Sequence, residues 1–202
     1  MGLGSALRHK ARSYSGSTMA QSRRVNAERH KKPRPPLDGG ALERIALFYV
    51  GRYATTRAKL RAYLARKLRE RGWEGAGDPA IEPLVERFSS LGYVDDGAFA
   101  VARTASLQRR GYGERRVGQA LHAAGIEAAD AERAKEQARD GAFDAALRFA
   151  ERRRIGPYAS AVPERAAREK AFAAMVRAGH SLDLVRRIVD APPGEIPECD
   201  SF

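Results

Sequence analysis

Two adjacent carboxylates, Asp95 and Asp96, are the pair in this sequence whose chemistry most needs an explanation. They lie in the stretch GYVDDGAFA, between a glycine–tyrosine turn and a new apolar run that begins at Phe99. Paired carboxylates can bind a metal ion or transfer protons, but an aspartate directly before an apolar run can also cap the first turn of a helix. The pair lacks the spacing of an EF-hand loop and the glutamate that closes one. We therefore expect both aspartates to be structural caps.

The other residues with catalytic or metal-binding potential are isolated along the chain. His122 and His180 fall at the ends of different predicted helices, and Cys199 stands in an acidic segment without a basic neighbour. The sequence contains no GxxxxGK phosphate loop and no CxxC or HExxH motif. Its single cysteine excludes an internal disulfide, which is compatible with a reducing compartment. We expect a cytoplasmic protein that is not an enzyme and uses no metal and no cofactor.

Arginine clusters are the remaining candidates for a functional site. The formal net charge is +12, and an excess of this size favours a polyanionic partner such as nucleic acid. Arginine binds both phosphates and carboxylates through two parallel hydrogen bonds. For any one arginine the alternative is an exposed charge that only keeps the protein soluble. We expect the binding surface to include Arg57 and Arg61 in a first cluster, Arg103, Arg109, Arg110, Arg115 and Arg116 in a second, and Arg152 and Arg153 in a third.

Helices must position these side chains, because apolar residues from Ala41 onward recur with helical spacing. Ile81, Leu84 and Phe88, for example, follow the i, i+3, i+7 pattern of one helix face. No stretch alternates between apolar and polar residues as a half-buried strand does. We predict an all-α protein with helices at residues 41–51, 55–71, 79–91, 97–110, 114–124, 128–139, 142–154, 164–178 and 182–190.

Three of the predicted helices end at a glycine that follows a similar pattern. Gly72, Gly125 and Gly179 lie about 53 residues apart, and each has an apolar residue four positions earlier. We expect these glycines to be helix caps, because glycine readily adopts the left-handed conformation that ends many helices. The period predicts tandem units of three helices, at residues 41–94, 95–140 and 141–191. Such units stack into an elongated, curved array that presents a long groove.

Both termini differ in composition from the helical region. Residues 1–40 are rich in Lys, Arg, Pro and Gly and contain few large apolar residues, so we expect a disordered basic tail. This tail could bind phosphates without sequence preference or only keep the protein soluble. Residues 192–202 form a short acidic tail. The longest apolar run, IALFYV at residues 45–50, is far too short to span a membrane.

The central region resembles a signature of the RecX family, the regulators of the RecA recombinase. The resemblance is carried by LGYVDDGAFA and RRGYGERRVGQALHAAGI, within residues 91–126. Its matching positions are Gly92, Tyr93, Asp95, Asp96, Phe99, Ala100, Arg103, Gly111, Gly113, Arg116, Leu121, Gly125 and Ile126. RAKLRAYLARKLRERG at residues 57–72 and VRAGHSLDLVRRIV at residues 176–189 are similar to the first and last repeats of the family. The chain departs from the family at His180, where an aromatic residue is common, and at residues 155–165, which lengthen a loop.

The resemblance implies a fold of tandem three-helix repeats and a role in homologous recombination, DNA repair and the SOS response. It also implies binding within the groove of the RecA–DNA filament and inhibition or modulation of the RecA ATPase and strand-exchange activities. The expected partners are the RecA filament and single- or double-stranded DNA without sequence preference, and we expect a monomer that does not bind membranes. The alternative is a stand-alone DNA-binding protein that uses basic helices and the tail. The two hypotheses differ in whether binding to DNA depends on RecA.

Overall fold

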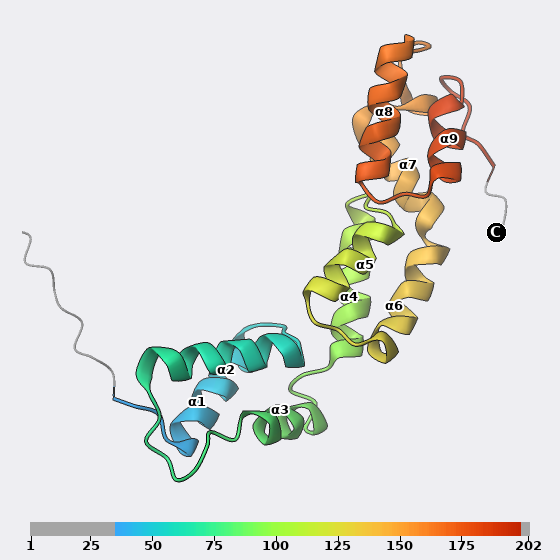
Figure 1. Ribbon diagram of the computed structural model, residues 1–202. Coiled ribbons are helices and arrows are strands. Elements are labelled where there is room, and N and C mark those ends of the chain that lie inside the picture. The colour runs from blue at the N-terminus through green and yellow to red at the C-terminus, as the bar shows by residue number, and fades with distance from the viewer. Residues whose placement is uncertain (1–34, 199–202) are drawn as a thin grey trace, which may run out of the picture. The chain divides into compact units, whose positions relative to one another are not determined.

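The helices of the structure lie close to the ranges predicted from the sequence. A computed structural model of the chain describes residues 35–198. Regular secondary structure in this range is helical throughout, so the predicted all-α class is confirmed (Figure 1). The helices are α1 (Gly39–Arg52), α2 (Arg57–Arg71), α3 (Ile81–Ser90), α4 (Asp96–Arg109), α5 (Glu114–Ala123), α6 (Ala128–Asp140), α7 (Ala142–Arg153), the short 3-10 helix η1 (Gly156–Tyr158), α8 (Arg165–Arg177) and α9 (Leu182–Asp190). Most of the predicted basic tail and the last residues of the acidic tail lie outside the described range.

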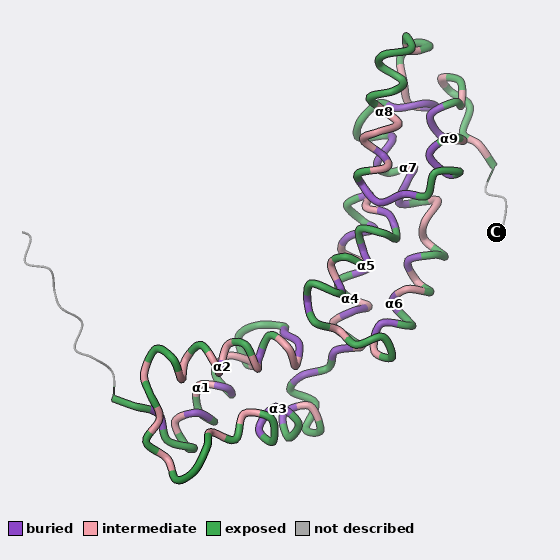
Figure 2. Tube along the Cα trace, in the orientation of Figure 1, coloured by how far each residue is buried: buried purple, intermediate pink, exposed green. Residues whose placement is uncertain are grey.

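Each successive group of three helices surrounds an apolar core of its own, and buried positions recur along the helices of all three groups (Figure 2). We call these groups the first unit (α1–α3), the second unit (α4–α6) and the third unit (α7–α9). Burying one Leu, Val, Ile, Met or Phe side chain contributes about 1.5–3 kcal/mol, so each unit has its own source of stability. The tandem three-helix organisation predicted from the sequence is confirmed. The cores are centred on Leu60, Leu64 and Phe88 in the first unit, Leu107, Val117 and Leu121 in the second, and Met175, Val185 and Ile188 in the third.

The segment before α1 belongs to the folded first unit. Leu37 is fully buried, and its N–H donates to the carbonyl of Gly72 over 3.0 Å. The carbonyl of Leu37 accepts from the N–H of Glu74, also over 3.0 Å. Asp38 then caps α1 by accepting from the N–H of Ala41. The folded region therefore begins before residue 40, where the sequence placed the end of the tail, because Leu37 enters the core and Asp38 caps the first helix from the surface.

The second helices of neighbouring units are joined end to end. At the joint between the second and third units, the N–H of Gly113, the N-cap of α5, donates to the carbonyl of Ala178, the C-cap of α8, over 3.0 Å. At the joint between the first and second units, the hydroxyl of Thr56, the N-cap of α2, donates to the carbonyl of Ala124, the C-cap of α5, over 2.7 Å. Each joint pairs polar groups that helix ends leave free and aligns the two helix dipoles favourably.

The glycines that follow α5 and α8 leave no room for a side chain at these joints. Gly125 has a φ of +70° and Gly179 a φ of +97°, and Gly72 after α2 has a φ of +82°. A Cβ atom at Gly125 would overlap the methyl group of Ala58, and one at Gly179 would overlap the backbone of Arg116. Glycine is therefore needed at both joints for close packing as well as for backbone conformation.

We expect Gly125→Ala to destabilise the protein more than Gly92→Ala does. Gly92 is a matched control, because its φ is +75° but a Cβ there meets open space. The left-handed backbone should cost both variants about 1–2 kcal/mol in unfolding free energy. The overlap with Ala58 should cost Gly125→Ala about 1–3 kcal/mol more. Urea unfolding followed by circular dichroism measures both losses, and equal losses would show that the joint adapts to a methyl group.

His180 is buried at the joint between the second and third units. The residue is 1 % exposed, its Nε2 lies 3.1 Å from the carbonyl oxygen of Gly111, and its ring packs edge-on against Phe149. A carbonyl can only accept, so Nε2 carries the proton and donates. Burial lowers the pKa of His180 to about 4, the bond to Gly111 opposes this shift, and the charge of Arg115 adds to it. His180 is therefore neutral in the folded protein at neutral pH.

The lowered pKa of His180 predicts a loss of stability in acid. Because the unfolded pKa is about 6.5, the unfolded chain binds the extra proton between that value and the folded value of about 4. The free energy of unfolding is therefore not reduced by His180 above about pH 6.5, the pKa in the unfolded chain. It falls by up to about 3 kcal/mol as the pH drops to about 4, the pKa in the folded protein. His180→Phe, which keeps an aromatic ring, should unfold with a shallower pH dependence in this window. Denaturant titrations of both proteins across the window measure the difference, and parallel curves would contradict the assignment.

Candidate functional site

Asp95 and Asp96 make different contacts, although the sequence predicted a cap for both. The Asp95 carboxylate accepts from the N–H of Ala98 over 2.8 Å and is the N-cap of α4. Asp96 does not cap this helix: its carboxylate accepts from the backbone N–H of Arg57 over 2.9 Å and lies 3.4 Å from Nε of the same residue. Asp96 therefore accepts a backbone hydrogen bond from the first turn of α2, a helix of the first unit. Its side chain is only 2 % exposed. Sequence spacing could not show this tertiary contact.

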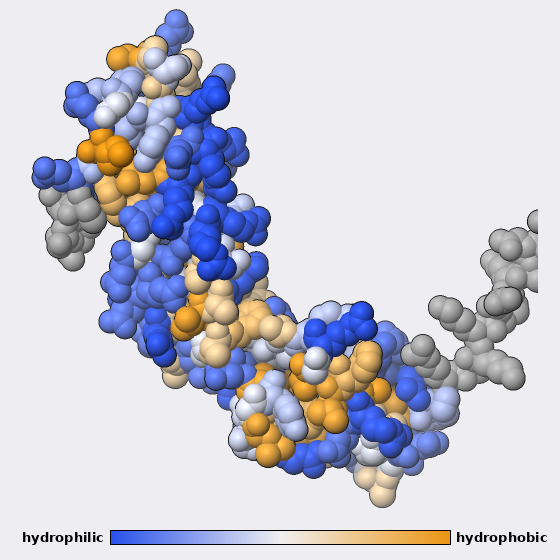
Figure 3. Space-filling model, turned by 180° about the vertical axis from the view of Figure 1, so that it is seen from behind, coloured by the Kyte–Doolittle hydropathy of each residue, from blue (hydrophilic) through white to orange (hydrophobic). Residues whose placement is uncertain are grey.

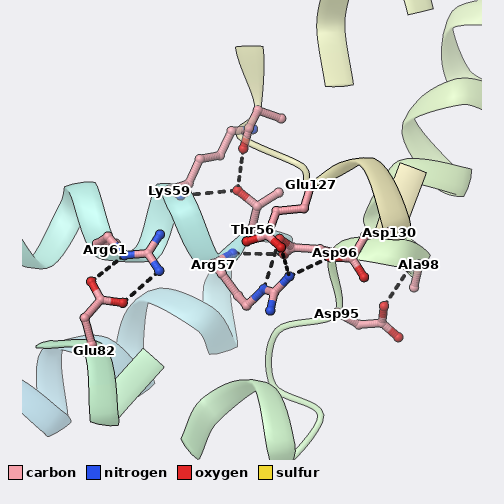
Figure 4. A network of polar contacts seen from close by, with 11 residues as sticks. Thr56, Arg57, Lys59, Arg61, Glu82, Asp95, Asp96, Ala98, Glu127 and Asp130 are labelled. Atoms are coloured by element: carbon pink, nitrogen blue, oxygen red, sulfur yellow. Dashed lines mark hydrogen bonds and ion pairs between the residues drawn. The ribbon is translucent and has the colours of Figure 1, made fainter. Parts of the chain in front are cut away.

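Arg57, predicted as a binding residue, is surrounded by carboxylates of its own chain (Figure 4). Besides the contacts with Asp96, its Nη2 lies 2.5 Å from Oδ2 of Asp130 and 3.9 Å from Oε2 of Glu127. Burial lowers the pKa of Arg57, but the hydrogen bond to Asp96 and the neighbouring negative charges outweigh this effect and raise the pKa above its usual value. The structure therefore places Arg57 inside the joint between the first and second units.

Arg61 pairs with a carboxylate within the first unit. Its guanidinium makes two hydrogen bonds to Glu82 of α3, over 2.5 and 2.8 Å. These bonds raise the pKa of Arg61 and lower the pKa of Glu82. Both side chains are substantially exposed, so the pair contributes about 0.2–1 kcal/mol at most. Arg61 lies on the surface with its charge already matched.

The predicted residues near the third unit also make internal contacts. Arg115 donates to the carbonyl of Val176 over 2.9 Å, and Arg152 donates to the carbonyl of Arg110, so both side chains link the second and third units. The guanidinium of Arg153 lies 5.7 Å from the ring centre of Phe149 within α7. Arg109 is exposed at the C-terminal end of α4. These residues are not gathered into a single surface with the first cluster.

The structure brings Arg103, Arg110 and Arg116 together with Lys59 in one groove, which we call the basic groove. It has a volume of about 710 Å³ and is lined by residues of α2, α4 and α5 and of the segments that adjoin these helices. Its apolar lining includes Phe99, Leu107 and Tyr112 and several alanines. No carboxylate lines the basic groove, and none of its four cations forms an ion pair with any residue of the described range. A groove of this kind attracts anions because its positive charge is not neutralised internally.

Two of the groove cations lie over aromatic rings. Nζ of Lys59 lies 4.5 Å from the ring centre of Phe99, and the guanidinium of Arg110 lies 5.3 Å from that of Tyr112. Such contacts orient a long side chain at a gain of about 0.5–1 kcal/mol while leaving its hydrogen-bond donors available. The groove therefore presents cations that are held in place but not satisfied by an acceptor.

A cavity of similar size between α8 and α9 has a different character. Its volume is about 660 Å³, but Glu169 and Asp190 line it together with arginines. Arg165 lies 2.9 Å from Glu169 and Arg168 lies 2.7 Å from Asp190, so these charges are paired. On the face shown in Figure 3 the most hydrophilic residues gather over the second and third units, interrupted by small apolar patches. Of these two cavities, the basic groove is the one that combines unpaired cations with an acid-free lining. A smaller cavity of about 300 Å³ beside η1 and α8, whose lining includes Arg153, Arg154 and Lys170, is also free of acidic residues.

The described residues contain no group of His, Cys, Asp or Glu side chains suited to hold a metal ion. Within the same range, no helix is long and apolar enough to cross a membrane.

The sequence analysis missed part of the groove although one signal for it was available. Phe99, Arg103 and Leu107 follow an i, i+4, i+8 pattern, which places them on one face of α4, and the C-cap Arg110 continues the pattern at i+11. Lys59 could not be assigned from spacing, because it enters the groove from another unit. The partners of Arg57 were missed for the same reason.

Comparisons with known proteins give the family of the chain. No protein-family model matches it. A relative named Regulatory protein RecX from Myxococcus xanthus (strain DK1622) is 29 % identical over 163 residues, which cover 75 % of this chain and 86 % of the relative. Another protein of the same name, from Agrobacterium fabrum (strain C58), is 30 % identical over 148 residues, which cover 71 % of this chain and 79 % of the relative.

Solved structures share the fold at lower identity. The crystal structure of RecX from Lactobacillus salivarius superposes with a TM-score of 0.59 at 19 % identity, over 74 % of this chain and 93 % of that one. A crystal structure of regulatory protein RecX gives a TM-score of 0.55 at 19 % identity, over 75 % and 73 % of the two chains. The structural likeness shows the common fold, and the sequence identity over most of the Agrobacterium relative shows common family membership. This chain belongs to the RecX family of regulatory proteins.

Proposed function

We propose that this protein binds the RecA–DNA filament through the basic groove and lowers the RecA ATPase and strand-exchange activities. The family membership supports a regulatory role, and the resemblance of residues 91–126 to the RecX signature supports RecA as the partner. The observation that carries the choice of surface is the set of four unpaired cations around an acid-free groove. A filament offers such a surface both DNA phosphates and protein carboxylates, which arginine binds with similar geometry.

The proposed binding is non-enzymatic. Lys59, Arg103, Arg110 and Arg116 can bind and orient anions, but no nucleophile–base pair faces them in the groove. Inhibition then follows from occupancy: a ligand bound across filament subunits holds them in one arrangement and opposes changes that the ATPase cycle requires. We expect the protein to act as a monomer in the cytoplasm, with the basic residues of the N-terminal segment adding affinity without specificity.

Reversing two groove charges should weaken inhibition of the RecA ATPase. In Arg103→Glu with Arg116→Glu, two attractive contacts become repulsive, so the concentration needed for half-inhibition should rise about tenfold or more, equivalent to about 1.4 kcal/mol. The matched control is Arg44→Glu with Arg133→Glu, which changes the net charge equally at exposed positions outside the groove. Circular dichroism verifies the fold of each variant. If both pairs raise the half-inhibitory concentration equally, only net charge matters and the groove is not the site.

Stand-alone binding of single-stranded nucleic acid is a second candidate function, favoured by the half-buried rings of Phe99 and Tyr112 in a positive groove. Fluorescence anisotropy of labelled single-stranded DNA separates the two functions. The filament hypothesis predicts much tighter binding when RecA coats the DNA than when it is bare. Equal affinity for bare and coated DNA would favour the stand-alone function.

A further inference from the structure

The joint between the first and second units is held mainly by polar groups. The apolar cores of these two units are separate, and no buried apolar cluster of residues 35–198 spans the joint. The other joint differs, because Tyr112 packs against the cores of both the second and the third unit. The contacts across the first joint include the hydroxyl of Thr56 on Ala124, the close approach of Ala58 to Gly125, the carboxylates around Arg57 and the ammonium group of Lys59 over the ring of Phe99.

Arg57 is the centre of these polar contacts (Figure 4). Its backbone N–H and Nε reach Asp96 at the start of α4, and its Nη2 reaches Asp130 near the start of α6. One side chain of the first unit thus binds carboxylates in the first turns of two helices of the second unit. Asp96 is almost completely buried and Arg57 is 23 % exposed, so solvent screens their attraction less than it screens a surface pair. We call these three residues the Arg57 cluster.

The basic groove has walls on both sides of this joint. Lys59 and Ala54 come from the first unit, whereas Arg103, Arg110 and Arg116 come from the second. Lys59 lies two residues from Arg57 in the first turn of α2. Any movement of the first unit against the second therefore changes the spacing between Lys59 and the groove arginines. The Arg57 cluster opposes such movement.

We propose that Arg57, Asp96 and Asp130 are positioning residues that set the geometry of the basic groove without contacting the partner. The effect on partner binding rests on the proposed function, whereas the effect on groove geometry belongs to the free protein. The proposal replaces the direct binding role that the sequence predicted for Arg57. It makes the affinity of a basic site depend on two acidic residues.

The direction in which one double substitution changes the affinity for the filament distinguishes a positioning role of Arg57 from direct binding. Asp96→Asn combined with Asp130→Asn removes two negative charges, which makes the net charge more positive by two and takes away the two carboxylates closest to the guanidinium of Arg57. If Arg57 binds the anionic partner directly, the double variant binds the RecA–DNA filament more tightly. If the cluster positions the groove, the variant binds the filament more weakly. The affinity falls about tenfold if only about one tenth of the molecules keep the groove in its binding geometry.

The matched control is Glu70→Gln combined with Glu82→Gln. It changes the net charge by the same amount and breaks the ion pairs of these glutamates with Lys67, Arg66 and Arg61, all of which lie within the first unit. Fluorescence anisotropy on RecA-coated single-stranded DNA should give a weaker complex for the aspartate variant and an equal or tighter complex for the control. Tighter or unchanged binding by a folded aspartate variant would overturn the proposal.

A distance measurement in the free protein tests the geometry without RecA. Spin labels at Ala54→Cys and Gln119→Cys, with Cys199→Ser as background, lie on opposite sides of the joint along the groove. Arg57→Gln should broaden the distribution of label distances, whereas Arg66→Gln, which removes an ion pair with Glu70 inside α2, should leave it unchanged. An unchanged distribution in Arg57→Gln would refute the positioning role even if filament binding fell. Failure of the unlabelled wild-type protein to bind the filament would refute the proposed function alone.

Discussion

Pairing of helix ends between neighbouring units is the interaction on which the rest of the structure depends. In both joints an N-cap residue, Thr56 or Gly113, donates to the carbonyl of a C-cap alanine in the next unit. Lys59 and Arg116 each lie three residues after such an N-cap. The same contact that satisfies the helix ends therefore also positions one groove cation on each side, because the first turn of a helix moves with its cap.

Internal contacts decide which arginines remain available to a partner. Arg57, Arg61, Arg115 and Arg152 resemble the groove arginines in sequence, yet each has an acceptor within the chain. Arg103 and Arg116 have none in the described range, so an incoming anion does not have to displace a carboxylate from them. Clustering in sequence indicates high local charge, but the distribution of acidic residues in the folded chain determines where this charge can act.

The fold was readable from the sequence because its signals are local. The apolar spacing of Ile81, Leu84 and Phe88 depends on one helix, and the glycines after α2, α5 and α8 mark helix ends wherever those helices pack. Only part of the site could be predicted, because the spacing along α4 and its C-cap aligns Phe99, Arg103 and Arg110 but not the residues of other helices. The contact of Asp96 with Arg57 joins residues that are 39 positions apart, and no local pattern encodes it. For the same reason the sequence did not predict that Lys59 lines the groove or that the folded region begins at Leu37.

The backbone of Leu37 occupies, at the N-terminal end of the array of units, a position that joins two units elsewhere in the chain. Its N–H donates to the carbonyl of Gly72, just as the N–H of Arg115 donates to the carbonyl of the equivalent Gly179. Leu37 thus occupies the acceptor that the second helix of a preceding unit would use. The series of joints is terminated by the chain itself at this end. The contact that joins two units at Gly179 is therefore made within the first unit at Gly72, by the backbone of a single buried leucine.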